Sequence, residues 1–307
     1  MTTDEQTSEP TSADRATTDV AAARQTPKVT PWLPPGQLID LADRGTTFAR
    51  MAPGPSPGAP TLLLLHGWTA TADLNWYMSY APLAKHFNVL ALDHRGHGRG
   101  IRSKSPFRLE DCADDAAALV EHLKLGRVLP VGYSMGGAIA QLFWRQHPDL
   151  TQGLVLCSTA PYFAGSRQEK VGFLGLTGLA ALSRATPSKA RTWLTDQIYL
   201  QRKTESWDVW AIDEVSQNDW TAVLQAGIAL GQFDSREWLP DVDVATSVVI
   251  TMQDDVVATR RQIRLFEGIK HAEAYRVDGG HDACVSKPHL FAPALIRACN
   301  SVLERAD

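Results

Sequence analysis

The chain has 307 residues, of which 44% are hydrophobic and 21% charged, and its formal net charge is −4 at pH 7. This length suits one large α/β domain, or a domain with an insertion, and the apolar content is sufficient for a sizeable core. The mildly negative charge excludes the strongly basic surface that attracts nucleic acids or anionic membranes, so we expect no nucleic-acid partner.

The cysteines are far apart and lack the CxxC spacing of zinc sites and disulfide frameworks. They are Cys112, Cys157, Cys284 and Cys299. The N-terminus has no basic-then-apolar signal pattern, and no apolar run approaches the roughly 20 residues that span a bilayer. We therefore expect reduced and buried thiols, no metal, no membrane span and a cytoplasmic location.

Residues 1 to about 33 are rich in Thr, Ala, Asp, Glu and Pro and contain almost no large apolar side chains. Such a segment cannot bury enough apolar surface to offset the entropy lost on ordering. The sequence therefore predicts a disordered N-terminal tail, residues 1–33.

The following residues alternate between short apolar strands and helical patterns. Strands are predicted at residues 37–41, 46–51, 61–65, 87–92, 127–131, 153–157, 247–251 and 272–277. Helices are predicted at residues 75–86, 109–123, 135–147, 259–268 and 286–304. The first two strands predict a hairpin at a sheet edge. Strand–helix alternation predicts an α/β fold with a mostly parallel central sheet covered by helices on both faces.

The alternation stops between about residues 160 and 240, where the pattern predicts several helices. This segment contains five tryptophans: Trp193, Trp207, Trp210, Trp220 and Trp238. A helical insertion between two strands of a parallel sheet is typical of a lid. We therefore expect a core formed by residues 34–159 and 241–307, with residues 160–240 as a helical cap.

A Gly-x-Ser-x-Gly motif, Gly132 to Gly136, separates an apolar strand from an Ala-rich helix. In this context the serine lies at the tip of a tight strand-to-helix turn with its hydroxyl exposed to a substrate. The start of the helix adds backbone N–H groups and the positive end of a dipole. The motif predicts Ser134 as a nucleophile.

A serine hydroxyl needs a base, and reactive groups in parallel sheets lie at the carboxyl ends of strands. His281 follows the last predicted strand on a loop with two glycines and is the predicted base. The base needs a carboxylate, which the loop after residues 247–251 supplies. We favour Asp254, with Asp255 as the alternate acid.

Attack by a serine creates an oxyanion, which requires preorganised hydrogen-bond donors. The backbone N–H of Met135, directly after the nucleophile, is one candidate. The backbone N–H of Trp68 is the other, because His66-Gly67-Trp68 follows the apolar strand 61–65 and Gly67 lets the backbone turn inwards.

Together these features resemble the α/β-hydrolase superfamily, in the branch with Ser-Asp-His triads and helical caps. The resemblance covers about residues 36 to 305 and is carried by the motifs His66-Gly67-Trp68, Asp93-His94-Arg95-Gly96-His97-Gly98 and Gly132 to Gly137, with Asp254 and Gly280-His281. It implies that Asp93 to Gly98 is a structural turn beneath the site. The acid loop departs from the family pattern, because Asp255 doubles the acid and Ala258 stands where relatives often have proline.

The predicted activity is that of a serine hydrolase acting on a carboxylic ester with an apolar acyl or aromatic group, without cofactor or metal. Carbon–carbon bond hydrolases, lactonases, thioesterases and cofactor-free perhydrolases use the same residues and stay open as alternatives. A non-catalytic small-molecule-binding protein of the same fold is the alternative from another class. The expected partner is a small, apolar substrate, and the sequence leaves the oligomeric state undetermined.

Overall fold

The computed structural model describes residues 31–185 and 209–306 of the chain. The expected disorder of residues 1–30, and the tryptophans Trp193 and Trp207 of the expected cap, lie outside the described residues. Residues 31–185 and 209–306 belong to one compact unit, Pro31–Asp307.

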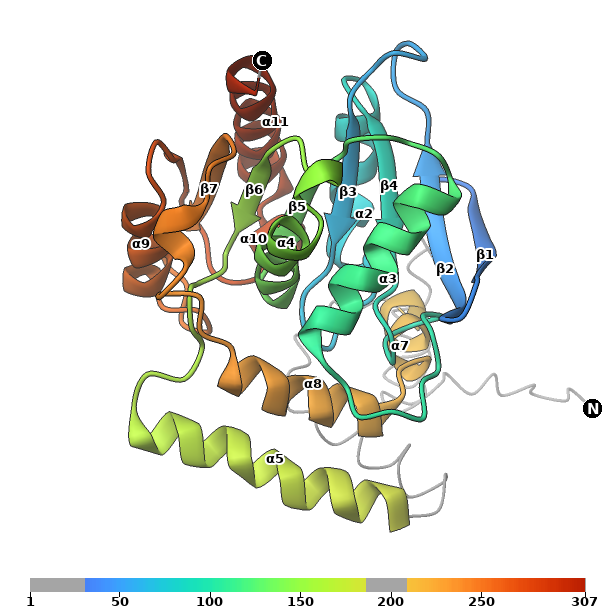
Figure 1. Ribbon diagram of the computed structural model, residues 1–307, viewed down its shortest axis with the longest axis vertical. Helices are drawn as coiled ribbons and strands as arrows, with labels where there is room; N and C mark the ends of the chain where they lie inside the picture. Colours follow the sequence, from blue (N-terminus) through green and yellow to red (C-terminus); the bar gives the residue numbers. More distant parts are fainter. Residues whose placement is uncertain (1–30, 186–208, 307) are drawn as a thin grey trace, which may run out of the picture. The chain divides into compact units, whose positions relative to one another are not determined.

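The centre of this unit is an eight-stranded sheet in the order β1-β2-β4-β3-β5-β6-β7-β8 (Figure 1). Its strands are β1 (Gly36–Leu41), β2 (Gly45–Ala52), β3 (Thr61–Leu65), β4 (Asn88–Leu92), β5 (Leu129–Tyr133), β6 (Leu154–Cys157), β7 (Thr246–Thr251) and β8 (Glu273–Val277). β1 and β2 pair antiparallel at one edge, and β2 pairs antiparallel with β4. All other neighbouring strands are parallel, so their carboxyl ends meet at one edge of the sheet.

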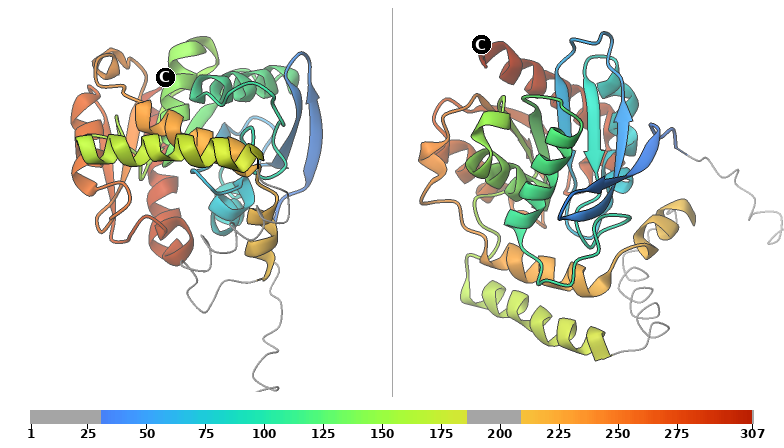
Figure 2. Two further views of the ribbon diagram at one scale, coloured as in Figure 1. Left: turned by 90° about the horizontal axis from the view of Figure 1, so that it is seen from below. Right: turned by 45° about the vertical axis from the view of Figure 1, so that its right-hand side comes forward.

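Helices cover both faces of the sheet (Figures 1 and 2). One face packs against α3 (Leu109–His122), α4 (Met135–Gln146) and α9 (Thr259–Gly268). The other face packs against α2 (Ala72–Ala84), α10 (Ala283–Ser286) and α11 (Pro288–Arg305). Short 3-10 helices η1 (Pro148–Leu150) and η2 (Leu239–Asp241) lie in connecting segments.

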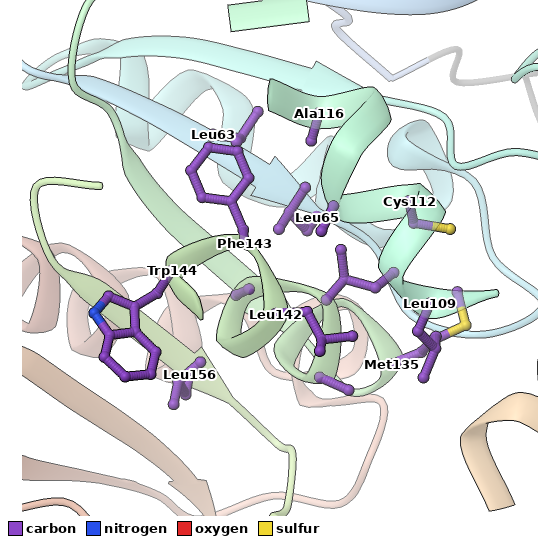
Figure 3. Packing of buried hydrophobic residues seen from close by; sticks show 14 of the residues in the cluster. Leu63, Leu65, Leu109, Cys112, Ala116, Met135, Leu142, Phe143, Trp144 and Leu156 are labelled. Atoms are coloured by element: carbon purple, nitrogen blue, oxygen red, sulfur yellow. The ribbon is translucent and has the colours of Figure 1, made fainter. Parts of the chain in front are cut away.

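Successive side chains along a strand point to opposite faces of the sheet, so the buried side chains of each strand are divided between these two layers. Leu63 and Leu65 of β3 belong to the layer with α3 and α4, whereas Leu62 and Leu64 belong to the layer with α2 and α11. Figure 3 shows part of the first layer, which includes Leu63 and Leu65 of β3 and Phe143 of α4. A strand that is apolar at every position is therefore buried on both faces, as parallel strands are.

In the described part of the predicted cap, the helices after β6 are α5 (Arg167–Ala185), α7 (Val209–Ser216) and α8 (Trp220–Gln232). α5 lies alongside α8 (Figures 1 and 2). Phe173 of α5 packs against Gly231 of α8, whereas Val171 and Leu174 of α5 are exposed. Trp210 and Trp238 make aromatic contacts with Tyr77 and Trp144.

The predicted α/β fold is confirmed, and two of the differences between predicted and observed helix boundaries have clear local reasons. α2 begins at Ala72 and not at residue 75, because the Thr71 side chain accepts the N–H of Leu74 as an N-cap. The final helix is divided at Lys287, between α10 and α11, and Pro288 begins α11. Proline suits the first turn of a helix but cannot continue a preceding one.

The four cysteines are free and buried, as predicted. Within residues 31–185 and 209–306, no helix is long and apolar enough to cross a membrane.

Candidate active site

Ser134 lies at the carboxyl end of β5, directly before α4, in a backbone conformation that few residues adopt. Its φ is 54° and its ψ is −116°. The turn is held by the Ser134 N–H, which donates to Cys157 O at 2.9 Å, and by Thr159 Oγ1, which donates to Ser134 O at 2.7 Å. A strained backbone of this kind persists only where surrounding contacts fix it, and it is a common feature of functional sites.

The glycines around Ser134 allow backbone segments to approach closely. A Cβ on Gly132 would lie 2.2 Å from Gly136 O, and a Cβ on Gly136 would lie 2.1 Å from Leu65 O. Both distances are shorter than any side chain tolerates. The glycines of the motif therefore permit the tight turn, and they also allow α4 to pack against the end of β3.

Three predicted site residues form one chain of hydrogen bonds at this edge of the sheet. His281 Nε2 lies 3.0 Å from Ser134 Oγ, and His281 Nδ1 lies 2.8 Å from Asp254 Oδ2. Ser134 follows β5, Asp254 follows β7 and His281 follows β8. The parallel sheet thus brings together side chains from three distant loops. Because a carboxylate only accepts, His281 Nδ1 carries the proton and Nε2 is free to accept from the serine hydroxyl.

The Asp254 side chain is buried and fully hydrogen-bonded. Its Oδ2 accepts from Thr251 Oγ1 at 2.7 Å and Gln262 Nε2 at 3.0 Å, and its Oδ1 accepts from the Val257 N–H at 2.8 Å. Burial alone would raise the pKa of Asp254, but the hydrogen bonds and the neighbouring His281 outweigh it and hold the pKa below its usual value. Asp254 is therefore ionised at neutral pH.

The neighbouring aspartate has a different environment. Asp255 is exposed, whereas Asp254 is 7% exposed. Of the two acids that the sequence left open, the structure brings Asp254 to His281.

The loop after β3 lies beside Ser134. A Cβ on Gly67 would lie 3.4 Å from Ser134 Cβ. The Gly67 carbonyl lies 2.8 Å from His66 Nδ1, and His66 Nε2 accepts the His94 N–H at 2.9 Å. The second contact leaves the proton of His66 on Nδ1, which donates to Gly67 O. Burial lowers the pKa of His66 to about 4, so this ring is neutral.

These contacts fix the peptide that carries the Trp68 N–H. In a trans peptide the carbonyl and the N–H point in opposite directions, so the Trp68 N–H points away from the His66 ring. Met135 is the first residue of α4, where N–H groups have no partner within the helix. Both predicted oxyanion donors therefore lie on the segments that adjoin Ser134.

The turn from Asp93 to Gly100 is held by ion pairs and backbone contacts. Arg95 donates to both carboxylate oxygens of Asp115, at 2.7 Å each. Asp93 accepts from the N–H groups of Ala72 and Arg99 at 2.8 and 2.9 Å. These contacts agree with the structural role that the resemblance implies for this turn. In the part of the chain that the structure describes, no cluster of His, Cys, Asp and Glu has the geometry to hold a metal ion.

α8 contacts the loops at the carboxyl ends of β3 and β4. The Trp68 indole Nε1 donates to Val223 O at 2.7 Å, and the Asp219 N–H donates to Gly96 O at 2.8 Å. α7 is joined to the same region, because Glu214 Oε2 accepts from Arg99 Nη2 at 3.2 Å. Helices α7 and α8 thus adjoin the edge of the sheet that carries Ser134.

Sequence reasoning did not single out the residues that support the site. These are Asn75, Tyr133, Thr251 and Gln262, which contact the loops of the predicted site residues. Tyr133 precedes the nucleophile directly, which is a signal that could have drawn attention to it. The others lie in helices or at strand ends and carry no local motif.

Comparison with known proteins places the chain in a family. A family model described as the alpha/beta hydrolase fold matches residues 60–288. A protein of Agrobacterium fabrum, provisionally named carbamate hydrolase RutD, is 27% identical over 247 residues, which are 78% of this chain and 92% of the relative.

Solved structures agree on the fold. The enol-lactonase from Burkholderia xenovorans LB400 has a TM-score of 0.72 at 22% identity and covers 86% of this chain and 100% of its own. The esterase EaEST from Exiguobacterium antarcticum has a TM-score of 0.71 at 21% identity and covers 87% of this chain and 100% of its own. The family and its relatives define the enzyme class as that of the hydrolases. The chain belongs to the alpha/beta hydrolase family.

Proposed function

We propose that this hydrolase cleaves carboxylic esters through an acyl-enzyme formed on Ser134. The observation that carries the proposal is the hydrogen-bonded chain from Ser134 Oγ to His281, at 3.0 Å, and from His281 to Asp254, at 2.8 Å. A serine hydroxyl is a weak nucleophile at neutral pH, and an adjacent base whose orientation is fixed by a carboxylate makes it reactive.

In the proposed reaction, His281 Nε2 accepts the Ser134 proton while Oγ attacks the ester carbonyl carbon. Asp254 stabilises the imidazolium and keeps its Nε2 towards the serine. The backbone N–H groups of Met135 and Trp68 stabilise the oxyanion of the tetrahedral intermediate. His281 then protonates the departing alcohol. A water molecule, deprotonated by His281, attacks the acyl carbon and releases the acid and free Ser134.

The helices between residues 160 and 240 are the proposed cap, and we propose that they bind the apolar part of the substrate. The support for this is their contact with the loop that carries Trp68, through Val223 and Gly227 of α8. Phe173 and Leu176 of α5 pack against α8 and add apolar surface on the same element. An acyl or aromatic ester with an apolar side is the substrate class that such a cap favours.

Hydrolysis of p-nitrophenyl esters of increasing acyl length tests the proposal. Ser134→Ala should lower kcat on the order of a million-fold, because a triad without its nucleophile retains only residual catalysis. Ser56→Ala, in an exposed loop, is the matched control and should hydrolyse the esters at the wild-type rate. Wild-type activity no higher than that of Ser134→Ala would show that ester hydrolysis is the wrong chemistry.

Carbamate hydrolysis is a second candidate, favoured by the relative of Agrobacterium fabrum that carries this name. Attack on a carbamate carbonyl uses the same nucleophile, base and oxyanion donors. Lactones, thioesters, carbon–carbon bonds and perhydrolysis need the same residues as well. Parallel assays on a p-nitrophenyl carbamate, a lactone and a thioester distinguish most of these substrates by their kcat/KM.

A binding protein without activity is the alternative from another class. A fluorophosphonate probe reacts only with an activated serine, so it labels Ser134 in a serine hydrolase. An unlabelled wild-type protein would favour the binding protein.

A further inference from the structure

Asn75 lies in the first turns of α2, between the loop after β3 and the segment that follows His281. Its side chain is 5% exposed. Oδ1 accepts the Gly67 N–H at 2.8 Å, and Nδ2 donates to Cys284 Sγ at 3.8 Å. The mechanism proposed above makes no use of this residue.

The contact with Gly67 completes the restraint of the loop that carries the Trp68 N–H. Gly67 has its carbonyl bound by His66 Nδ1 at 2.8 Å and its N–H bound by Asn75. A glycine has little intrinsic preference among backbone conformations, so hydrogen bonds on both of its peptide groups decide which way the next N–H points. Asn75 therefore restrains the Gly67–Trp68 peptide from the side opposite to His66.

The second contact of the carboxamide links this loop to the His281 side of the site. Cys284 lies in α10, which packs against α2. Burial raises the pKa of the Cys284 thiol to about 12, so the acceptor is a neutral sulfur. Tyr133 Oη donates to His281 O at 2.6 Å and fixes the same segment from the end of β5.

Only one orientation of the Asn75 amide satisfies both contacts. The reverse orientation would place the NH₂ group against the Gly67 N–H, so that two donors would face each other. An apolar residue would leave the buried Gly67 N–H without its acceptor, which is unfavourable. The position thus requires an oxygen towards Gly67 and a donor towards Cys284.

We infer that Asn75 is a positioning residue that holds the Gly67–Trp68 peptide in the orientation in which the Trp68 N–H stabilises the oxyanion. This inference rests on the proposed function. The oxyanion exists only along the reaction, so a loss of this orientation lowers kcat and leaves substrate binding unchanged.

The test compares Asn75→Leu and Asn75→Asp with wild type on a p-nitrophenyl ester. Asn75→Leu removes the acceptor of the Gly67 N–H. Asn75→Asp keeps an acceptor but removes the donor to Cys284 and adds a buried negative charge beside the developing oxyanion. We expect kcat to fall by about 10- to 100-fold in both variants, with KM within about twofold of wild type.

An inhibitor pair separates positioning from a general loss of structure. An aryl trifluoromethyl ketone forms a tetrahedral adduct with a serine hydroxyl, and it should bind each variant more weakly by the factor lost in kcat. The corresponding anilide, an uncharged analogue of the unreacted ester, should bind all forms equally. Ser79→Ala is the control, because Ser79 lies buried on the same helix and its hydroxyl has no hydrogen-bond partner among the described residues. It should retain wild-type kinetics.

Each outcome decides one of the two proposals. If kcat of either Asn75 variant equals that of wild type, or if KM rises by the same factor by which kcat falls, the inference about Asn75 is wrong and the ester proposal is unaffected. If Asn75→Leu does not fold, Asn75→Asp decides the question.

If wild type is no more active than Ser134→Ala, the ester proposal is wrong, and the rate of fluorophosphonate labelling then replaces kcat as the measure of the Asn75 variants. Equal labelling rates in wild type and the Asn75 variants, or an unlabelled wild type, contradict the inference.

Discussion

Asp254 and His281 stand 27 positions apart in the chain, and their side chains are joined by a hydrogen bond of 2.8 Å. Asp254 lies after β7 and His281 after β8, and these strands are parallel neighbours at one edge of the sheet. The Gln253 N–H donates to Gly279 O at 2.9 Å and ties the two loops together. The pair is therefore set by the sheet register and by a direct bond between the loops.

Replacement of each of the adjacent aspartates tests this pair. Asp254→Asn should lower kcat by roughly 10⁴-fold, because an amide no longer fixes the His281 tautomer or stabilises its cation. Asp255→Asn should retain kcat within about twofold, because Asp255 is exposed. The measurement is kcat on a p-nitrophenyl ester. The opposite ranking would identify Asp255 as the acid.

The stability of the fold should depend on the ionisation of Asp254. Its pKa is lower in the folded chain than its ordinary value, so the unfolded chain binds protons more readily in acid. The contribution of Asp254 is present above its unfolded pKa, about 3.9, and is lost as the pH falls through the folded pKa. Urea unfolding between pH 6 and pH 3 should therefore show a smaller loss of unfolding free energy for Asp254→Asn than for wild type. Equal losses would contradict this role.

The close approach of α4 to β3 should make Gly136 intolerant of a side chain. Gly136→Ala places a Cβ 2.1 Å from Leu65 O, a backbone atom that cannot rotate away. We expect a loss of about 3 kcal/mol of unfolding free energy and inactive protein. Gly58→Ala, where a Cβ meets no atom within 4 Å, should change the free energy by less than about 0.5 kcal/mol. Chemical denaturation of both variants provides the comparison.

The contact between α8 and Trp68 should couple the proposed cap to the site. A Cβ on Gly227 would lie 2.6 Å from Trp68 Cζ2 and 2.5 Å from Leu176 Cδ1. Gly227→Ala should therefore displace the Trp68 ring, shift the tryptophan emission and lower kcat/KM several-fold, at a cost of about 1–3 kcal/mol.

Gly172→Ala is the matched helical control for Gly227→Ala. A Cβ on Gly172 of α5 meets no atom within 4 Å, so alanine should stabilise this helix by up to about 1 kcal/mol without affecting kcat/KM. Indistinguishable kinetics for Gly227→Ala and wild type would show that α8 does not act on the site through Trp68.

Much of the fold could be predicted from local patterns. Continuous apolar runs such as Thr61–Leu65 are buried on both faces of the sheet, and the structure has a strand over these same residues. The 135–147 pattern corresponds to α4, which ends one residue earlier. The predicted bounds of helices were in error at their ends, because a cap such as Thr71 acts through a single side-chain hydrogen bond, which the spacing of apolar residues does not reveal.

The sequence by itself determined the position of the turn at Ser134, because glycines, an apolar strand and a helical pattern are all local features. It also limited the acid to two adjacent aspartates and placed His281 on a loop after the last strand. Which aspartate meets His281 was decided only in the tertiary structure, where Asp254 is buried and Asp255 exposed. The contact of Asn75 with Gly67 was decided there as well. The spacing of apolar residues along a chain indicates which side chains are buried. The partner of a polar side chain depends instead on where separate backbone segments meet.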